Sequence, residues 1–234
     1  MLLQGDTALV TGAGGGIGRG IAQALREEGA QVLGADLEGG DLAFDLAKSP
    51  PALLVEKCVE KLKAVSILVH CASPRRRESQ TALAVTEAEW REMLEVNLNA
   101  GFLLAQAAAR HMVERNAKGR ILFITSLHSY APRNLPHYSA AKAGQTMVVR
   151  ELAKALGPKG IRVNAIAPGA IPGGGFQMPP EMTQKIPLRR AGTPADVAAM
   201  AVAVLSERFG RYVTGATVVV DGGLALHNWI DPPA

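Results

Sequence analysis

Apolar runs alternate with helix-length segments along most of the chain. The first run ends with Leu9 and Val10 and leads into the glycine-rich segment Thr11-Gly12-Ala13-Gly14-Gly15-Gly16-Ile17-Gly18. Apolar residues then recur at helical spacing, at Ile17, Ile21, Ala24 and Leu25. Gly29 is a natural left-handed cap for this helix, and a second apolar run over 31–35 ends in Asp36. The pattern therefore predicts a strand, a glycine turn, a helix and a second strand.

Four further apolar runs follow, over residues 67–71, 120–125, 161–167 and 216–220. The longest helical patterns extend from about 87 to 114 and from about 137 to 156, and both are rich in Ala, Leu and Met. Strands that alternate with helices favour a parallel sheet with helices on both faces. We therefore expect an α/β protein of one domain over 1–234, because no repeat or linker marks a second.

Two segments depart from this alternation. Residues 169–187 combine glycines with apolar side chains, which favours a mobile lid over a pocket; they include Gly173, Gly174, Gly175, Phe176, Met178, Pro179, Pro180 and Met182. The C-terminal tail, 224–234, contains Trp229 and is apolar enough that we expect it to fold against a neighbouring subunit.

Composition narrows the class of protein. Apolar residues make up 48% and charged residues 20%, with a formal charge of +4, which is typical of a globular protein. The two cysteines, Cys58 and Cys71, lack metal or redox spacing, so we expect a reducing cytoplasm. No apolar run approaches the roughly 18 residues of a membrane span. With 4% aromatic residues we expect no nucleic acid partner. The run Arg75-Arg76-Arg77 could bind a phosphate or an acidic substrate, but we favour its interpretation as a solvated loop after a strand.

The glycine turn and Asp36 together indicate a dinucleotide site. Gly12, Gly16 and Gly18 allow close approach of the backbone to a pyrophosphate, and the helix that follows directs N–H groups at its charge. Asp36 lies 24 residues beyond Gly12, where a carboxylate accepts hydrogen bonds from the adenosine ribose and repels a 2′-phosphate. No Arg or Lys stands at Gly14, Gly15 or Leu37 to offset that repulsion, so the sequence favours NAD over NADP.

A second group of residues indicates acid–base chemistry. Tyr138 and Lys142 are four residues apart in a helical pattern and share one face. A phenol has a pKa near 10, and a neighbouring cation favours the phenolate that a general base requires. Ser126 ends the strand at 120–125, where its hydroxyl would bind a substrate carbonyl.

These residues occur in the order found in one known family. Thr11-Gly12-x-x-x-Gly16-x-Gly18, Asn97, Ser126, Tyr138-x-x-x-Lys142, Arg162-Val163-Asn164 and Pro168-Gly169 are all present. From Thr7 to Gly223 the chain resembles a short-chain dehydrogenase/reductase. This resemblance implies a Rossmann fold with a parallel sheet of about seven strands, a homotetramer, and hydride transfer between a nicotinamide cofactor and a small substrate.

The resemblance also implies roles for individual residues. Tyr138 would be the general acid or base, Lys142 would hold the nicotinamide ribose, Ser126 would position the carbonyl, and Asn97 would bend its helix and hold a water linked to Lys142. Asp45 and Leu46 would meet the adenine. The remaining positions that the family pattern assigns to the cofactor are Gly14, Ile17, Cys71, Ala72, Pro168, Gly169 and Ile171.

Three positions depart from the family pattern. Cys71-Ala72-Ser73 replaces Asn-Ala-Gly after the fourth strand, which affects how closely the backbone approaches the adenosine ribose. The spacing from Ser126 to Tyr138 is one residue shorter than usual, so either the loop 127–137 is trimmed or Thr125 shares the role of Ser126; we favour the trimmed loop. Gly173 replaces a Thr that touches the carboxamide, which would rest on backbone groups of Ile171 instead.

Four other residues near the expected pocket are not assigned to the reaction. His128 and His137 flank the expected pocket without partnered carboxylates, so we expect no metal site. Cys71 is interpreted as a core residue, and Tyr130 as either a substrate contact or a loop aromatic.

The leading hypothesis is an NAD-dependent oxidoreductase that interconverts a secondary alcohol and a ketone, with Tyr138 as the acid–base group. The lid composition favours a small or moderately apolar alcohol or a polyol. The alternatives are an NADPH-dependent 3-oxoacyl thioester reductase, which Asp36 disfavours, and a nucleotide-sensing protein without catalysis, which the intact set Ser126, Tyr138 and Lys142 disfavours.

Overall fold

A computed structural model describes residues 1–173, 176, 178–179 and 181–226. Strand β1 (Thr7–Thr11) leads through the glycine turn into α1 (Gly16–Glu27), and β2 (Gln31–Asp36) follows and pairs in parallel with β1. Helix α1 ends two residues before Gly29, which adopts φ 93°, the left-handed conformation that glycine favours. The predicted strand, turn, helix and strand are therefore confirmed.

Seven parallel strands form the central sheet, in the order β3-β2-β1-β4-β5-β6-β7. The remaining strands are β3 (Leu42–Ala43), β4 (Ile67–His70), β5 (Gly119–Ile124), β6 (Ile161–Pro168) and β7 (Thr217–Val220). Four of these five begin or end within one residue of the predicted runs, whereas β3 was not predicted. A strand of two residues carries too little alternation to be read from a sequence.

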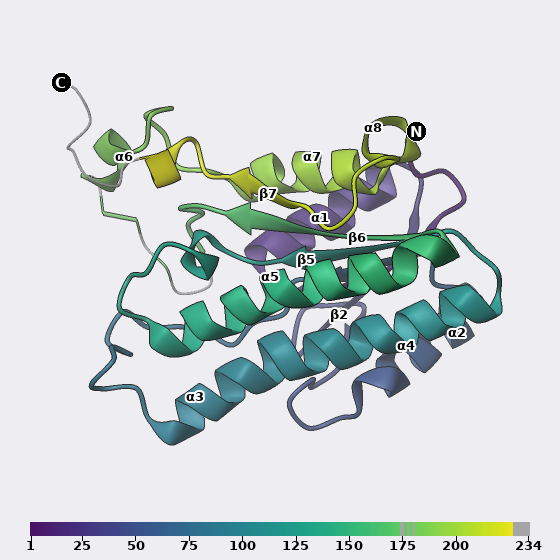
Figure 1. The fold of residues 1–234 in the computed structure, drawn as a ribbon, viewed down its shortest axis with the longest axis horizontal. Coiled ribbons are helices and arrows are strands. Elements are labelled where there is room, and N and C mark those ends of the chain that lie inside the picture. Colours follow the sequence, from purple (N-terminus) through teal and green to yellow (C-terminus); the bar gives the residue numbers. More distant parts are fainter. Residues whose placement is uncertain (174–175, 177, 180, 227–234) are drawn as a thin grey trace.

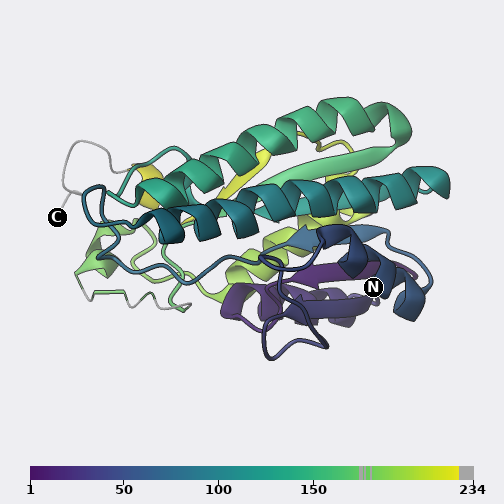
Figure 2. The same cartoon turned by 90° about the horizontal axis from the view of Figure 1, so that it is seen from below.

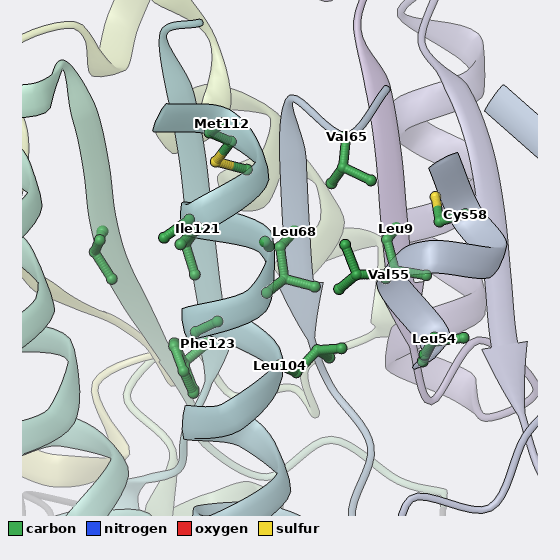
Figure 3. Packing of buried hydrophobic residues seen from close by; sticks show 14 of the residues in the cluster. Leu9, Leu54, Val55, Cys58, Val65, Leu68, Leu104, Met112, Ile121 and Phe123 are labelled. Atoms are coloured by element: carbon green, nitrogen blue, oxygen red, sulfur yellow. The ribbon is translucent and has the colours of Figure 1, made fainter. Parts of the chain in front are cut away.

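Helices cover both faces of this sheet, as Figures 1 and 2 show. Helices α1 and α7 (Pro194–Leu205) lie on one face, and α2 (Pro51–Leu62), α4 (Ala100–Glu114) and α5 (Pro136–Leu156) cover the other. Because side chains alternate along a strand, neighbouring residues of β1 enter different cores: Leu9 packs towards α2 and α4, while Ala8 and Val10 pack towards α1 and α7. Figure 3 shows the first of these cores, in which Leu9, Leu54 and Leu104 are fully buried.

The long helical pattern predicted for 87–114 contains an irregularity. It consists of α3 (Glu87–Leu94), a π-helical turn at Glu95–Asn99, and α4. Thr86 and Glu89 form a capping box that fixes the start of α3. The π turn contains Asn97, the residue expected to bend this helix.

The predicted lid and tail are described only in part. Within 169–187, Gly173 and Phe176 form an antiparallel bridge and Met182–Lys185 form the short helix α6. Gly174, Gly175 and Pro180 lie outside the described residues, as does Trp229 in the tail. No helix in the described part of the chain combines the length and the hydropathy needed to cross a membrane.

Candidate active site

A cleft of about 480 Å³ opens at the carboxyl edge of the sheet. Strand β1 lies between β2 and β4, so the chain proceeds outwards from β1 in one direction and later returns to extend the sheet in the other. Parallel sheets bind ligands at such a switch point, beyond the carboxyl ends of the strands. The cleft is therefore where the fold alone places a cofactor.

The glycine turn forms one wall of this cleft. Gly12 has φ +73°, and a Cβ there would lie 2.8 Å from the backbone N of Ala72. A Cβ on Gly18 would collide with the carbonyl oxygen of Gly12. No side chain caps α1, so N–H groups in its first turn remain available to an anion where Gly16, Ile17 and Gly18 line the cleft. The turn thus has the geometry that a pyrophosphate requires.

Asp36 stands beside this turn at the end of β2. Its Oδ2 accepts a hydrogen bond from the Gly14 amide at 2.8 Å, and its Oδ1 accepts one from the Leu37 amide at 2.7 Å. Both bonds hold the carboxylate in one position at the wall of the cleft, which Asp36 lines while Gly14 does not. A fixed negative charge at this place suits the hydroxyls of a ribose and opposes a phosphate.

Most other predicted cofactor contacts share the same cleft. The carboxylate of Asp45 accepts a hydrogen bond from the Ala47 amide and forms an ion pair with Lys48 at 3.1 Å. The hydrogen bond from Lys48 is the main cause that lowers the pKa of Asp45. The cleft is also lined by Leu46, Cys71, Ala72, Pro168, Gly169 and Ile171. Burial raises the pKa of the Cys71 thiol to about 12, so this residue is neutral packing rather than a nucleophile.

The acid–base group lies at the opposite end of the cleft from Asp36. Tyr138 occupies the first turn of α5, and Lys142 follows one turn later with its Nζ 5.6 Å from the centre of the Tyr138 ring. Lys142 is 2% exposed and donates a hydrogen bond to the Ile124 carbonyl at 2.8 Å. Ser126, directly beyond β5, forms a hydrogen bond with Tyr138 that lowers the pKa of the phenol. The structure therefore brings Ser126, Tyr138 and Lys142 together.

Thr125 has a different partner from Ser126. Its hydroxyl donates to the Ile166 carbonyl at 2.9 Å, which turns it towards β6. The loop between Ser126 and α5 contains only a short 3-10 helix, Leu127–Ser129, before α5 begins at Pro136. This arrangement supports the trimmed loop rather than a shared role for Thr125.

Asn97 is fully buried behind the cleft and does not line it. Its side-chain amide donates to the Met93 carbonyl at 3.0 Å and to the Ser73 hydroxyl at 3.1 Å. Its own backbone carbonyl accepts bonds from Gln145 Nε2 at 2.7 Å and from His70 Nε2 at 3.2 Å. Asn97 thus joins the π turn to α5 and to the end of β4.

Burial shifts the pKa values of both Tyr138 and Lys142. Burial is the main cause that raises the pKa of Tyr138, and it lowers the pKa of Lys142 to about 8. The cation that lowers the pKa of the phenol is Arg76, not Lys142. The electrostatic environment of Tyr138 therefore includes a residue that sequence reasoning did not assign to the site.

The interpretation of Arg75-Arg76-Arg77 as a solvated loop is wrong for its middle residue. Arg75 is exposed, and Arg77 is 70% exposed with Glu89 as its partner. The side chain of Arg76 is 19% exposed, and its guanidinium lies 4.9 Å from the centre of the Tyr138 ring and 5.5 Å from that of Phe176. One arginine of the three therefore turns inward, towards the rings of Tyr138 and Phe176.

The two flanking histidines are buried beside the site and do not line the cleft. His128 packs edge to face on Tyr138 with ring centres 5.2 Å apart, and burial is the main cause that lowers its pKa to about 4. His137 is fully buried, and burial also lowers its pKa. Tyr130 is 54% exposed, and Gly173 has φ 130° at the rim of the cleft.

A parallel sheet with a glycine turn at its switch point and a Ser-Tyr-Lys group facing the same cleft defines a dinucleotide-binding oxidoreductase of the Rossmann type. Residues 12–225 match the family model described as Enoyl-(Acyl carrier protein) reductase. The chain belongs to the short-chain dehydrogenase/reductase family, and it is an oxidoreductase for substrates of the alcohol and ketone type.

Relatives in this family differ in substrate and cofactor. The chain is 35% identical to glucose 1-dehydrogenase 2 of Bacillus subtilis (strain 168), over 96% of each sequence. It is 34% identical to L-rhamnose 1-dehydrogenase (NAD(P)(+)) of Azotobacter vinelandii, over 97% of this chain and 99% of that protein. Among solved structures, a 3-ketoacyl-(acyl-carrier-protein) reductase from Brucella melitensis complexed with NADH has 30% identity and a TM-score of 0.89, covering 95% of this chain and 99% of that one.

Proposed function

We propose that the protein is an NAD-dependent oxidoreductase that interconverts a secondary alcohol and a ketone, with Tyr138 as the general acid and base. The convergence of Ser126 and Lys142 on Tyr138 within a cleft that also holds the glycine turn carries this proposal. NAD, when bound, supplies the hydride acceptor; the chain's own residues bind, orient and move the proton.

Each residue group has a defined task in this reaction. The turn at Gly12, Gly16 and Gly18 holds the pyrophosphate, and Asp36 holds the adenosine ribose. Ser126 binds the reacting oxygen of the substrate while Tyr138 takes its proton during oxidation and returns one during reduction. Lys142 binds the nicotinamide ribose, and Asn97 keeps the π turn against α5.

Asp36 supports NAD as the preferred cofactor. Its carboxylate is held by the amides of Gly14 and Leu37, so it cannot swing away from a 2′-phosphate without breaking two hydrogen bonds. Gly14 carries no side chain, and Leu37 is apolar and 62% exposed, so neither position supplies a cation. The guanidinium of Arg19, which lies beside the turn, donates a hydrogen bond to the Gly14 carbonyl.

An NADPH-dependent 3-oxoacyl thioester reductase is the second candidate function. The similarity to a solved 3-ketoacyl-(acyl-carrier-protein) reductase favours it. Asp36 opposes its NADPH requirement by the same argument, so the cofactor distinguishes the two functions.

We further propose a cytoplasmic homotetramer that acts on a small-molecule substrate. Both cysteines are free thiols in the structure, which suits a reducing compartment. The helices α4 and α5 together present an apolar surface that a second copy of the chain would cover.

One experiment tests cofactor and catalyst together. Wild type and Tyr138→Phe are titrated with NADH and NADPH by fluorescence and then assayed with NAD and a panel of secondary alcohols. We expect NADH to bind both proteins more tightly than NADPH, and Tyr138→Phe to lose about 1,000-fold in turnover, because it lacks only the transferable proton.

Tyr212→Phe is the matched control, since Tyr212 is fully exposed and does not line the cleft. An unchanged rate in Tyr138→Phe would remove Tyr138 from the mechanism. Tighter binding of NADPH than of NADH would overturn the proposed cofactor and favour the thioester reductase.

A further inference from the structure

Arg76 lines the cleft but has no task in the proposed reaction. Its guanidinium lies over the rings of Tyr138 and Phe176, at 4.9 and 5.5 Å from their centres. A cation over an aromatic ring is attracted to the electrons of the ring, which provides no hydrogen-bond acceptor of the carboxylate kind. The two rings therefore hold Arg76 in the cleft, and its hydrogen-bonding N–H edge needs other partners.

That edge has no hydrogen-bond acceptor among the described residues. The nearest carboxylate is that of Glu78, whose Oε1 lies 3.6 Å from the Nη1 atom of Arg76. Glu78 is 54% exposed and is shared with Arg133, also at 3.6 Å. The Nη1 atom itself is buried without a hydrogen bond. A buried donor of this kind costs free energy unless something binds it, so Arg76 is better explained by a ligand than by the fold.

The charge around Arg76 also favours an anion. The buried cation Lys142 has its Nζ 5.6 Å from the centre of the same tyrosine ring. His128, which packs edge to face on that ring, is neutral at physiological pH because burial lowers its pKa to about 4. Glu78 is the one carboxylate that the described residues place in ion-pair contact with Arg76. This end of the cleft therefore carries an excess of positive charge.

The cofactor's own anionic groups belong elsewhere in the cleft. The glycine turn follows β1 and Asp36 ends β2, whereas Ser126 follows β5 and Lys142 bonds the last carbonyl of β5, that of Ile124; β4 stands between β1 and β5. With strands about 4.8 Å apart, the end of β5 is displaced by about 10 Å from the end of β1 and about 14 Å from the end of β2 along the edge of the sheet. Arg76 thus faces the substrate rather than the pyrophosphate.

We propose that Arg76 is the specificity-determining residue for a substrate that carries a carboxylate within a few bonds of the reacting carbon, which makes the substrate class a hydroxy acid and the corresponding oxo acid. The planar guanidinium matches a carboxylate with two parallel N–H···O bonds, while Ser126 and Tyr138 bind the hydroxyl or carbonyl oxygen. This inference rests on the proposed function, because it identifies the substrate of the same site.

The test compares each acid with its neutral amide. Wild type, Arg76→Gln, Arg76→Lys and Arg77→Gln are assayed with NAD and with 3-hydroxybutanoate and 3-hydroxybutanamide, and then with the longer pair 4-hydroxypentanoate and its amide. We expect wild type to favour the acid, and Arg76→Gln to lose roughly 100-fold in kcat/KM for the acid relative to the amide. The ratio is the relevant quantity because Arg76 also lowers the pKa of Tyr138, an effect that both substrates share.

Two variants separate recognition from general charge. Arg76→Lys keeps the charge but loses the planar fork, so we expect an intermediate preference. Arg77→Gln removes the same charge one residue away, from a side chain that is 70% exposed and pairs with Glu89, and we expect it to retain the wild-type preference. Equal use of acid and amide by wild type, or an unchanged preference in Arg76→Gln, overturns the inference.

Calorimetric titration with 3-hydroxybutanoate, with and without NAD, keeps this test independent of turnover. Binding to wild type that is lost in Arg76→Gln supports the role of Arg76 even if no substrate is oxidised, in which case the proposed function fails alone. Oxidation of neutral alcohols without any preference for acids leaves the proposed function standing and refutes the role of Arg76. Absence of acid binding to wild type also refutes it.

Discussion

His70 links two parts of the site that are distant in the sequence. Its ring is fully buried at the end of β4; Nδ1 lies 3.1 Å from the Thr11 hydroxyl, and Nε2 lies 3.2 Å from the Asn97 carbonyl. The carbonyl only accepts, so Nε2 carries the proton and Nδ1 accepts from Thr11. The same Thr11 oxygen accepts bonds from the amides of Cys71 and Ala72. A neutral His70 thus holds the glycine turn and the π turn in register.

The pKa of His70 predicts a loss of stability in acid. Burial lowers this pKa to about 3, with the charge of Lys142 as a smaller cause. As the pH falls below the ordinary value near 6.5, the unfolded chain binds a proton that the folded chain does not, so the stability present above pH 6.5 is lost down to about pH 3. We expect a loss of a few kcal/mol from this residue.

Urea unfolding of wild type and His70→Gln between pH 7 and pH 4 measures this contribution. Glutamine has no titration in this range, so the free energy of unfolding of the variant should fall less steeply than that of wild type, whatever its value at pH 7. Parallel curves for the two proteins would show that His70 does not titrate on unfolding.

At the scale of elements, the glycine turn between β1 and α1 has steric requirements that differ from one glycine to the next. Gly12 needs a positive φ, and Gly18 needs the absence of a Cβ because the Gly12 carbonyl occupies that space. Gly15 has neither constraint: it is the N-cap of α1 with φ −86°, and a Cβ there would lie 3.5 Å from the Gly12 oxygen. Glycines of one motif therefore differ in what they contribute to the fold.

This difference predicts unequal effects of two alanine substitutions. Gly18→Ala forces the turn away from α1 and should lower the free energy of unfolding by roughly 1–3 kcal/mol. Gly15→Ala meets only an ordinary van der Waals contact and should change it by less than about 0.5 kcal/mol. Urea unfolding of both variants beside wild type measures the contrast, and equal losses would contradict it.

At the scale of the whole molecule, one surface remains apolar and uncovered. Helices α4 and α5 lie side by side on their face of the sheet, as Figure 2 shows, and form a groove with Leu98, Gly144 and Val148. Large side chains at its rim are well exposed: Phe102 at 38%, Leu103 at 44% and Met147 at 53%. Contiguous apolar surface of this kind marks an interface between proteins. It is the surface on which the proposed homotetramer depends.

Met147→Lys tests this assembly. A charge on this apolar face would have to be buried without a partner in the assembly, so we expect light scattering to give a mass near four chains for wild type and a smaller mass for the variant. Lys154→Met, on the same helix but outside the groove, serves as a control that should keep the wild-type mass. A monomeric wild type would contradict the tetramer.

Tertiary structure alone decided several features of the site. The pattern over 87–114 is continuous in the sequence, yet packing of Asn97 against α5 and β4 accompanies a π turn within it. The sequence predicts Arg76 to be one of three solvated arginines, whereas in the folded chain its guanidinium lies over the ring of Tyr138. The pKa values of Tyr138 and Lys142 depend on burial, which no spacing reveals.

The sequence by itself determined the parallel α/β architecture, the glycine turn, Asp36 at a strand end and the pairing of Tyr138 with Lys142. Each of these depends on interactions between residues close together in the chain: alternation along a strand, four-residue spacing on a helix, or a backbone conformation open to glycine. Inward rotation of Arg76, the bonds of His70 and the electrostatics of Tyr138 depend on contacts between residues far apart in the chain. Only the folded structure fixes those contacts, because their energies exist only once the sheet and helices have packed.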